Sequence, residues 1–288
     1  MPDTPRESKL ESLTPTRVVT VARVAGGTVR TTTDLAAAEE PLDVRLHGRS
    51  FAIIMRTPGL DRQLAAGFLQ SERIVRSPDD LGAVEHCRHP DQSRAHHVVD
   101  VYLRGTAAAR VPELLERRRA VIANSSCGVC GRSTIDELAS DLTPLPPSAP
   151  VPLDVIRALP DRLRRTQATF DETGGLHGAA VFTSSGEIVA AAEDVGRHNA
   201  VDKVFGTLLL DEVAVTPAAL AVSGRVSFEI VQKAWIGRVP IVVAVSAPTS
   251  LAVELANEAG IALLGFVRGD SLNVYTHTVR IAGVQTGR

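Results

Sequence analysis

Two cysteines three positions apart, Cys127 and Cys130, are the side chains of this 288-residue chain best suited to chemistry. The apolar run Ala120–Ala123 before them is typical of the end of a strand, and Ser133 with Asp136 is typical of a first helical turn. The thiols are therefore predicted on a loop of small residues, just ahead of a helix N-terminus. Partial positive charge there favours thiolate over thiol, which suits a nucleophile or a carrier of a transferred atom.

Three other roles are compatible with the same spacing. A zinc site would need two further ligands, which Cys87 and a histidine could supply. A structural disulfide between two such close residues would remove little entropy from the unfolded chain. A thioredoxin-type redox pair needs only the two thiols, so the spacing alone does not separate it from a carrier.

The densest group of polar side chains is the run Glu193-Asp194-Val195-Gly196-Arg197-His198-Asn199-Ala200-Val201-Asp202-Lys203. It enters a predicted helix, on which Asn199, Asp202 and Lys203 share one side. The two acidic residues at its start precede the turn. Such density favours a ligand-binding helix start over a solvated face. A helix start held by ion pairs, without any ligand, is the alternative.

Apolar strands alternate with helices after residue 153, which indicates a largely parallel sheet with helices on both faces. Ligands of such sheets bind beyond the carboxyl ends of the strands. The loops expected there carry small residues, hydroxyls and arginines, in Ser223–Arg225, Ser246–Ser250 and Gly265–Ser271. Helix N-termini and arginine bind phosphate, and Phe266 beside Arg268 offers a stacking surface for a nucleobase. These loops predict an anionic, phosphate-bearing ligand.

His177 is surrounded by small residues, in the run Gly175-Leu176-His177-Gly178-Ala179-Ala180. A ligand or another loop can approach such a histidine closely. A buried histidine bonded to the backbone fits the same run. The other histidines near the cysteines, His86, His89, His96 and His97, lie in polar surroundings and are expected at the surface.

The chain is predicted to consist of a disordered leader (1–16), an N-terminal α+β part with the cysteine loop (17–142), a proline-rich hinge (143–152) and an α/β part (153–288). Strands are expected over 18–24, 42–46, 51–56, 97–103, 179–183, 188–192, 219–223, 241–246, 262–266 and 272–275. Helices are expected over 61–74, 153–169, 198–210, 228–236 and 251–259.

The composition excludes several classes of protein. Hydrophobic residues make up 44% of the chain, but no apolar run approaches the length of a membrane span. The net charge of −2 argues against a general nucleic-acid binder. A polar N-terminus without a signal core and only three cysteines favour a reducing, cytoplasmic location. Lysine is scarce, with only Lys9, Lys203 and Lys233, so the lysine in the polar run suggests a need for its compact charge.

Four motifs stand in the order seen in the formate dehydrogenase accessory sulfurtransferases, which this chain resembles from about Val18 to His277. They are Cys127-Gly128-Val129-Cys130-Gly131, Thr173-Gly174-Gly175-Leu176-His177, the run Glu193–Lys203, and Gly265-Phe266-Val267-Arg268. The resemblance implies a bacterial cytoplasmic protein that accepts sulfur from a cysteine desulfurase. It would pass this sulfur to the molybdenum cofactor before the cofactor enters formate dehydrogenase. The resemblance also implies a fold similar to the cytidine deaminase core and a homodimer.

The family pattern assigns the persulfide to Cys127, with Cys130 as its helper, and the bis-molybdopterin guanine dinucleotide form of the cofactor to Phe266–Ser271. Arg197, Arg225 and Arg268 are expected to neutralise its phosphates, while Lys203 and Glu193 organise the floor of the site. The full predicted binding set is His177, Glu193, Asp194, Arg197, His198, Asn199, Asp202, Lys203, Ser223, Arg225, Phe266, Val267, Arg268, Gly269, Asp270 and Ser271.

The deaminase zinc signature is not present in its usual form. A His-x-Glu motif precedes the cysteine pair in those enzymes, whereas here the pair precedes His177 and no carboxylate follows two residues later. We therefore expect no deamination, no tightly bound metal, no nucleic-acid partner and no membrane association. Two functions of other classes stay open: a thiol–disulfide oxidoreductase with a nucleotide-binding part, and a nucleotide-binding or zinc-stabilised scaffold without catalysis.

Overall fold

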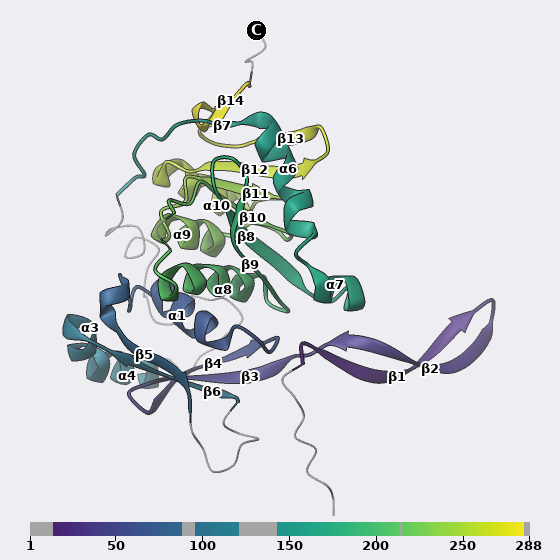
Figure 1. Cartoon of the computed structure of the whole chain (residues 1–288), viewed down its shortest axis with the longest axis horizontal. Coiled ribbons are helices and arrows are strands. Elements are labelled where there is room, and N and C mark those ends of the chain that lie inside the picture. Colours follow the sequence, from purple (N-terminus) through teal and green to yellow (C-terminus); the bar gives the residue numbers. More distant parts are fainter. Residues whose placement is uncertain (1–13, 88–95, 121–142, 214, 285–288) are drawn as a thin grey trace, which may run out of the picture.

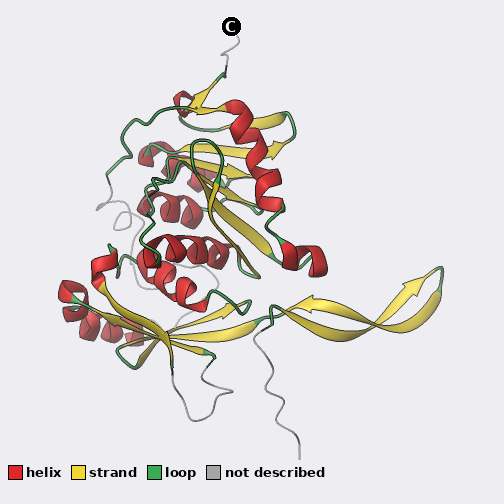
Figure 2. Cartoon of the chain, in the orientation of Figure 1, coloured by secondary structure: helices red, strands yellow, loops and turns green. Residues whose placement is uncertain are grey.

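The structure is a computed structural model that describes residues 14–87, 96–120, 143–213 and 215–284. Two halves pack side by side, and a long two-stranded ribbon projects from one of them (Figure 1). Each half has its own sheet, and helices of both halves lie between the two sheets (Figure 2).

The sheet of the N-terminal half has four strands in the order β4-β3-β6-β5. Its elements are β3 Glu40–Leu46, β4 Arg49–Arg56, α1 Asp61–Ser71, η1 Pro78–Asp80, β5 Leu81–His86, β6 Val98–Leu103, α3 Gly105–Ala109 and α4 Val111–Ala120. His47 and Gly48 join β3 to β4 with φ values of 48° and 77°, as a two-residue hairpin turn requires. Alternation in β3 places Leu42, Val44 and Leu46 on one face, where α1 covers them.

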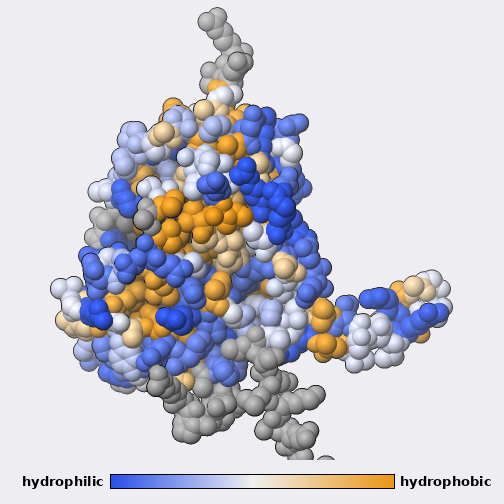
Figure 3. Space-filling view, in the orientation of Figure 1, coloured by the Kyte–Doolittle hydropathy of each residue, from blue (hydrophilic) through white to orange (hydrophobic). Residues whose placement is uncertain are grey.

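The projecting ribbon is the hairpin of β1 Thr16–Ala25 and β2 Thr28–Ala37, which turns at Gly26 and Gly27. Facing residues of an antiparallel pair share one side. One side of the ribbon therefore carries no charge and consists of Val18, Thr20, Ala22, Val24, Val29, Thr31, Thr33 and Leu35. Figure 3 shows apolar residues near the base and toward the tip of the ribbon. The ribbon is exposed near both ends, with Val18 near its base at 71% and Val24 near its tip at 64%.

The larger sheet has six strands in the order β13-β12-β11-β10-β8-β9. Its strands are β8 His177–Phe182, β9 Ile188–Asp194, β10 Ala219–Val222, β11 Ile241–Ala244, β12 Ala262–Arg268 and β13 Ser271–Val274. Only β10, β11 and β12 pair in parallel; the other three pairings are antiparallel. The prediction of a largely parallel sheet was therefore wrong. Short turns join β8 to β9 and β12 to β13, and a short turn can only connect antiparallel neighbours.

Helices cover both faces of this sheet, as the alternation of strands and helices predicted. Helix α6 Leu153–Arg164 packs on one face through Ile156, Leu159 and Leu163, and α7 Ala168–Thr173 follows it. The other face is covered by α8 Arg197–Leu210, α9 Phe228–Ile236 and α10 Ser250–Ala259. Within the residues that the structure describes, no helix is both long and apolar enough to cross a membrane.

The two halves meet where α1 crosses α8, and a glycine on each helix permits close contact. A Cβ atom at Gly67 would lie 1.9 Å from the backbone oxygen of Asp202. A Cβ atom at Gly206 would lie 1.8 Å from the backbone oxygen of Gln63. No larger residue fits at either position without moving a helix, so the crossing depends on these two glycines.

The proline-rich segment 143–152 lies along the second half and is bonded to it. Leu145 is buried in the core of that half. The Trp235 indole N–H donates to the Thr143 carbonyl at 2.9 Å, and Arg280 Nη2 donates to the Leu145 carbonyl at 3.0 Å. Its last two residues form β7 Val151–Pro152, which pairs with β14 Ile281–Ala282 next to the 3₁₀ turn η2 Thr278–Arg280. The structure thus attaches the predicted hinge to one half.

Candidate functional site

Loops from five strands meet at one edge of the larger sheet and bring many of the predicted ligand-binding residues together. The carboxyl ends of β10, β11 and β12 share this edge because these strands are parallel. β8 runs the opposite way, so its first residue, His177, lies at the same edge beside the end of β9. The loops are bonded to one another: Gly178 N donates to Ser223 Oγ at 2.9 Å, and Phe266 N to the Ser246 carbonyl at 3.1 Å.

Three helices begin at this edge. Helix α8 starts after Gly196, α9 after Ser227 and α10 after Thr249, whose hydroxyl accepts a hydrogen bond from Ala252 N at 3.3 Å. The first turn of each helix has backbone N–H groups without helical partners and carries partial positive charge. Three such starts on one edge are suited to an anionic ligand with more than one phosphate.

Part of the polar run after β9 joins the two halves. Asp194 and Lys203 are 0% and 1% exposed, and the Lys203 Nζ lies 2.7 Å from Asp194 Oδ2. Both reach Thr57, which follows β4: Lys203 Nζ donates to the Thr57 carbonyl at 2.8 Å, and Thr57 N donates to Asp194 Oδ2 at 3.2 Å. Asn199 Nδ2 donates to Asp194 Oδ1 at 2.9 Å and to the Met55 carbonyl at 2.8 Å. We call these five residues the clamp.

Asp202 has a similar role on the next turn of α8. Its Oδ1 accepts from the Ser71 hydroxyl of α1 and from Lys233 Nζ of α9, each at 2.6 Å. The predicted ligand contacts of Asp194, Asn199, Asp202 and Lys203 are thus replaced by contacts within the protein. The helical spacing did put them on one side, but that side faces α1 and the N-terminal sheet. An ion-paired helix start describes this part of the run better than a ligand site does.

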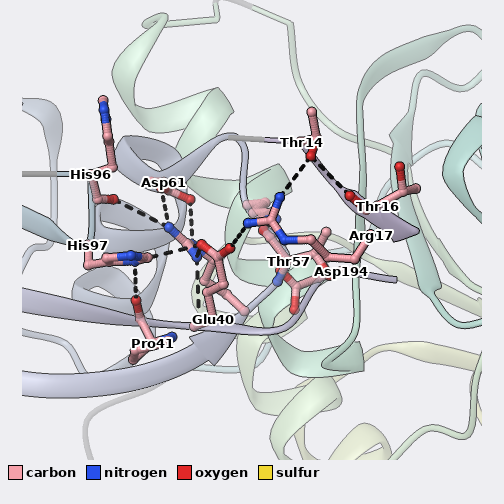
Figure 4. A network of polar contacts seen from close by, with 12 residues as sticks. Thr14, Thr16, Arg17, Glu40, Pro41, Thr57, Asp61, His96, His97 and Asp194 are labelled. Carbon is pink, nitrogen blue, oxygen red and sulfur yellow. Dashed lines mark hydrogen bonds and ion pairs between the residues drawn. The ribbon is translucent and has the colours of Figure 1, made fainter. Parts of the chain in front are cut away.

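A second buried network lies beside the clamp (Figure 4). Arg56 is 0% exposed, and its Nε and Nη2 atoms each donate to one carboxylate oxygen of Asp61 at 2.9 Å. Its Nη1 donates to Glu40 Oε2 at 3.3 Å. The sequence analysis did not single out these residues. A strand that ends in arginine and a helix that starts with aspartate are ordinary features, and only the tertiary fold brings them together.

Glu193 lies near the end of β9, at the edge of the larger sheet. Its two carboxylate oxygens accept hydrogen bonds from Thr169 N at 2.9 Å and Phe170 N at 2.8 Å. Both donors lie in the first turn of α7, where a carboxylate offsets the partial positive charge of the helix start. Glu193 therefore fixes α7 against the end of β9 and does not point a free carboxylate at a ligand.

Arg197 and His177 both lie close to Gly224 at the edge. A Cβ atom at Gly224 would lie 3.2 Å from His177 Nδ1 and 3.7 Å from Arg197 Cδ. The buried Nε of Arg197 has no hydrogen-bond partner among the described residues. Burial lowers the pKa of His177, and the charges of Arg197 and His198 lower it further. The edge thus presents a guanidinium with an unused donor beside an imidazole that is neutral near pH 7.

The His198 ring contacts two residues at the start of α9, Glu229 in its first turn and the cap residue Ser227. Its Nε2 lies 2.7 Å from Glu229 Oε2 and 3.0 Å from the Ser227 hydroxyl. The hydrogen bond with His198 lowers the pKa of Glu229, so this carboxylate is ionised at neutral pH. Glu229 was not found from the sequence, because a glutamate in the first turn of a helix is common on any surface.

The turn between β12 and β13 carries the segment predicted to bind the nucleotide end of the cofactor. Phe266 is 43% exposed, and Arg268 Nε donates to the Val245 carbonyl at 3.3 Å. The exposed residues of the turn are Phe266, Arg268, Gly269, Asp270 and Ser271. Val267 was predicted to bind the cofactor. Its side chain is 0% exposed in the core beneath α6 and is therefore not available to a ligand. Arg225, on the neighbouring loop, is exposed.

Cys127 and Cys130 lie outside the described residues, as does the helix start predicted at Ser133. Ala120, the first residue of the run predicted as a strand end, is instead the last residue of helix α4. Cys87 is half-buried on the outer side of the N-terminal sheet. Within the described ranges, no group of three His, Cys, Asp or Glu side chains could hold a metal ion. A zinc site that includes the cysteine pair is not tested by this observation.

Comparisons with known proteins agree on one family. Residues 37–282 match the sequence model of the FdhD/NarQ family. "Sulfur carrier protein FdhD" of Anaeromyxobacter dehalogenans strain 2CP-C is 49% identical over 265 residues, which cover 89% of this chain and 90% of that protein. The protein of the same name from Streptomyces coelicolor is 46% identical over 268 residues, with 91% and 94% covered. That from Mycobacterium tuberculosis strain H37Rv is 42% identical over 269 residues, with 91% and 96% covered.

The fold has a counterpart among solved structures. The crystal structure of a candidate formate dehydrogenase accessory protein from Desulfotalea psychrophila superposes with a TM-score of 0.72. The two sequences are 22% identical, and the match covers 93% of this chain and all of that one. This likeness concerns the fold alone, whereas the family model and the relatives align along nearly the full sequence. The chain therefore belongs to the FdhD/NarQ family.

Proposed function

We propose that this protein is a sulfur carrier that receives sulfur as a persulfide on Cys127 and transfers it to a molybdenum cofactor before the cofactor enters formate dehydrogenase. The observation that supports it most is the 49% identity to a protein named as a sulfur carrier, along nine tenths of both chains. A cysteine desulfurase is the proposed donor and formate dehydrogenase the proposed recipient, in the cytoplasm. The bound cofactor is substrate, in its bis-molybdopterin guanine dinucleotide form.

The first transfer is an exchange between sulfurs. The Cys127 thiolate attacks the outer sulfur of the donor's cysteine persulfide, a new S–S bond forms on Cys127, and the donor leaves as a thiolate. No electrons are gained or lost overall. In the second transfer the outer sulfur leaves Cys127 and a thiolate is regenerated. This sulfur needs two electrons to become sulfide, which a reduced molybdenum(IV) centre of the substrate can supply.

The edge of the larger sheet is the proposed cofactor site. Arg197 offers a donor that no described residue uses, and the starts of α8, α9 and α10 offer backbone N–H groups. Arg225 and Arg268 are exposed on the adjoining loops, where they can neutralise further phosphate oxygens. Exposed Phe266 gives a guanine ring a surface on which to stack. The clamp holds the helix that carries Arg197, but does not itself contact the ligand.

The test of this function compares Cys127→Ala with Cys130→Ala. Each variant is incubated with a cysteine desulfurase and cysteine, and the peptide that contains position 127 is weighed by mass spectrometry. The peptide from Cys130→Ala should gain the mass of one sulfur atom, and Cys127→Ala should fail to activate formate dehydrogenase. Equal and complete loss in both variants would favour a thiol–disulfide oxidoreductase. Stoichiometric zinc in reductively purified protein, with no transferable sulfur, would favour a scaffold.

The ribbon supports the further proposal of a homodimer. Strands of ten residues span roughly 33 Å and the pair is about 10 Å wide, so its uncharged side offers roughly 300 Å². In a two-fold dimer each copy both contributes a ribbon and covers one, which doubles this area to roughly 600 Å² per partner, at the low end of the range for stable interfaces. Sedimentation should give a dimer for the native protein and a monomer for Val24→Asp with Val29→Asp. A native monomer, or dimers of both, would refute the proposal.

A further inference from the structure

A pocket of about 380 Å³ opens beside the edge, on the face of the sheet that α6 and α7 cover. Its volume falls in the usual range for small-ligand sites, roughly 300–1,000 Å³. The lining comes from α6, α7, the turn before β8, and the ends of β10 and β11, and it includes Leu163, Gln167, Phe170, Leu176, His177 and Ser223. Only His177 and Ser223 of these were predicted to bind a ligand. They connect the pocket to the phosphate-binding edge.

The walls are apolar and one of them is flat. Leu163 and Leu176 are buried, and the Phe170 ring has the Arg164 guanidinium above it, 4.7 Å from its centroid. Arg164 also pairs with Asp171, so its charge is offset by a carboxylate. Stacked planar groups are suited to hold a planar ring, and a wall with a neutralised arginine does not call for an anion.

Three polar side chains of the pocket are uncharged and can form hydrogen bonds with a ligand: Gln167, His177 and Ser223. Gln167 is 3% exposed, and its carboxamide makes no hydrogen bond with any described residue. His177 is neutral near pH 7 and likewise makes no side-chain hydrogen bond within the described ranges. The Ser223 hydroxyl accepts from Gly178 N at 2.9 Å and retains its own hydrogen to donate. The amide atoms of Gln167 are not fully enclosed, so a ligand that enters the pocket can form hydrogen bonds with them.

The carboxamide of Gln167 lies against Gly178, the second residue of β8. A Cβ atom at Gly178 would lie 2.7 Å from Gln167 Cδ and 2.8 Å from Nε2, so a larger residue there would require the amide to move. A primary amide has a donor and an acceptor side by side. It therefore pairs with a ring that has an N–H next to a carbonyl, through two parallel hydrogen bonds.

We propose that this pocket binds a planar 2-amino-4-oxopyrimidine ring, the part that guanine and pterins share, with Gln167 on its N–H and carbonyl edge and Phe170 beside its face. The ring enters past His177, so that phosphates attached to it reach Arg197 at the edge. This site deepens the proposed function, on which it rests, by giving the cofactor a ring pocket separate from the turn at Phe266.

The test measures binding of two probes to the full-length protein, guanosine by calorimetry and 6-hydroxymethylpterin by its own fluorescence, with adenosine as a control. Adenosine lacks the N–H and carbonyl pair, so it should bind at least tenfold more weakly. Gln167→Met keeps the length and burial of the side chain but removes both hydrogen bonds. The affinity for each probe that binds the native protein should fall by about tenfold or more. Phe170→Leu, which leaves Gln167 in place, serves as a second variant and should weaken binding through the lost stacking.

The outcomes separate the source of the ring from the existence of the site. Binding of guanosine alone identifies the nucleotide end of the cofactor, and binding of the pterin alone identifies its metal-bearing end. The proposal is overturned if neither probe binds the native protein, or if both folded variants bind as tightly as the native protein does. Persulfide formation on Cys127 is recorded with the same preparations. Its presence without ring binding would reject the pocket and leave the proposed function standing, and the reverse result would reject the carrier role.

Discussion

Replacement of Lys203 by methionine should destabilise the whole protein. Among the described residues, Lys203 is the one side-chain cation paired with Asp194, a carboxylate that is 0% exposed, and the change also removes the hydrogen bonds that Lys203 donates to two backbone carbonyls. Breaking a buried ion pair from one side typically costs about 3–5 kcal/mol. Three N–H donors still reach Asp194, from Thr57, Gly196 and Asn199, so we expect the lower end of that range. The total stability of a protein is only about 5–15 kcal/mol, so this loss is severe.

Urea unfolding followed by circular dichroism measures the effect, with Arg23→Met as the matched control. Arg23 pairs with Asp34 on the exposed ribbon, where side chains are 66% and 53% accessible, so its loss should cost less than about 1 kcal/mol. The double variant Asp194→Asn with Lys203→Met lacks both charges of this pair, and should be about 1–3 kcal/mol more stable than Lys203→Met alone. A loss in Lys203→Met as small as that of Arg23→Met would refute the reasoning. So would a double variant no more stable than the single one.

Three further predictions concern the helix crossing and the edge. Gly67→Ala puts a methyl group 1.9 Å from the Asp202 carbonyl oxygen, so it should cost roughly 1–3 kcal/mol in thermal unfolding, whereas Glu258→Ala on an exposed face of α10 should change little. The pKa of His177 in the folded protein lies below its unfolded value of about 6.5, so the folded state binds fewer protons than the unfolded state. The stability contribution of His177 should therefore be fully present above about pH 6.5 and decrease as the pH falls from there through the folded pKa. His177→Gln should flatten this dependence, measured as the difference in unfolding free energy between about pH 7.5 and pH 5.5. Arg197→Gln should weaken GDP binding at least fivefold with unchanged stability, and equal binding would show that its free donor is not used by phosphate.

Local patterns predicted the elements well where burial alone sets them. Helix α9 was expected over Phe228–Ile236 and has those bounds, because an apolar stripe lies between a serine cap and a glycine. Strand β2, Thr28–Ala37, was missed, since its threonines and arginine face solvent and give no apolar alternation. Strand direction was also beyond reach, because only tertiary pairing places β10 between a parallel and an antiparallel neighbour.

The candidate site shows the same limit. The polar run was found because its residue types are unusual in one short stretch, yet its division into clamp and edge depends on Thr57, more than a hundred residues earlier. Gln167 gave no signal at all, since one glutamine between two helices is unremarkable. Its meaning comes from burial and from the glycine that makes room for it.

The close crossing of α1 and α8 has a consequence for how the protein is made. Helix α1 leaves the ribosome long before α8 is synthesised. During that time the surface of α1 around Gly67 and Ser71 has no α8 to pack against. A nascent chain stopped after α4 would expose this surface to other proteins. The halves are thus unlike independent modules, and fragments expressed separately should be poorly folded until they are mixed.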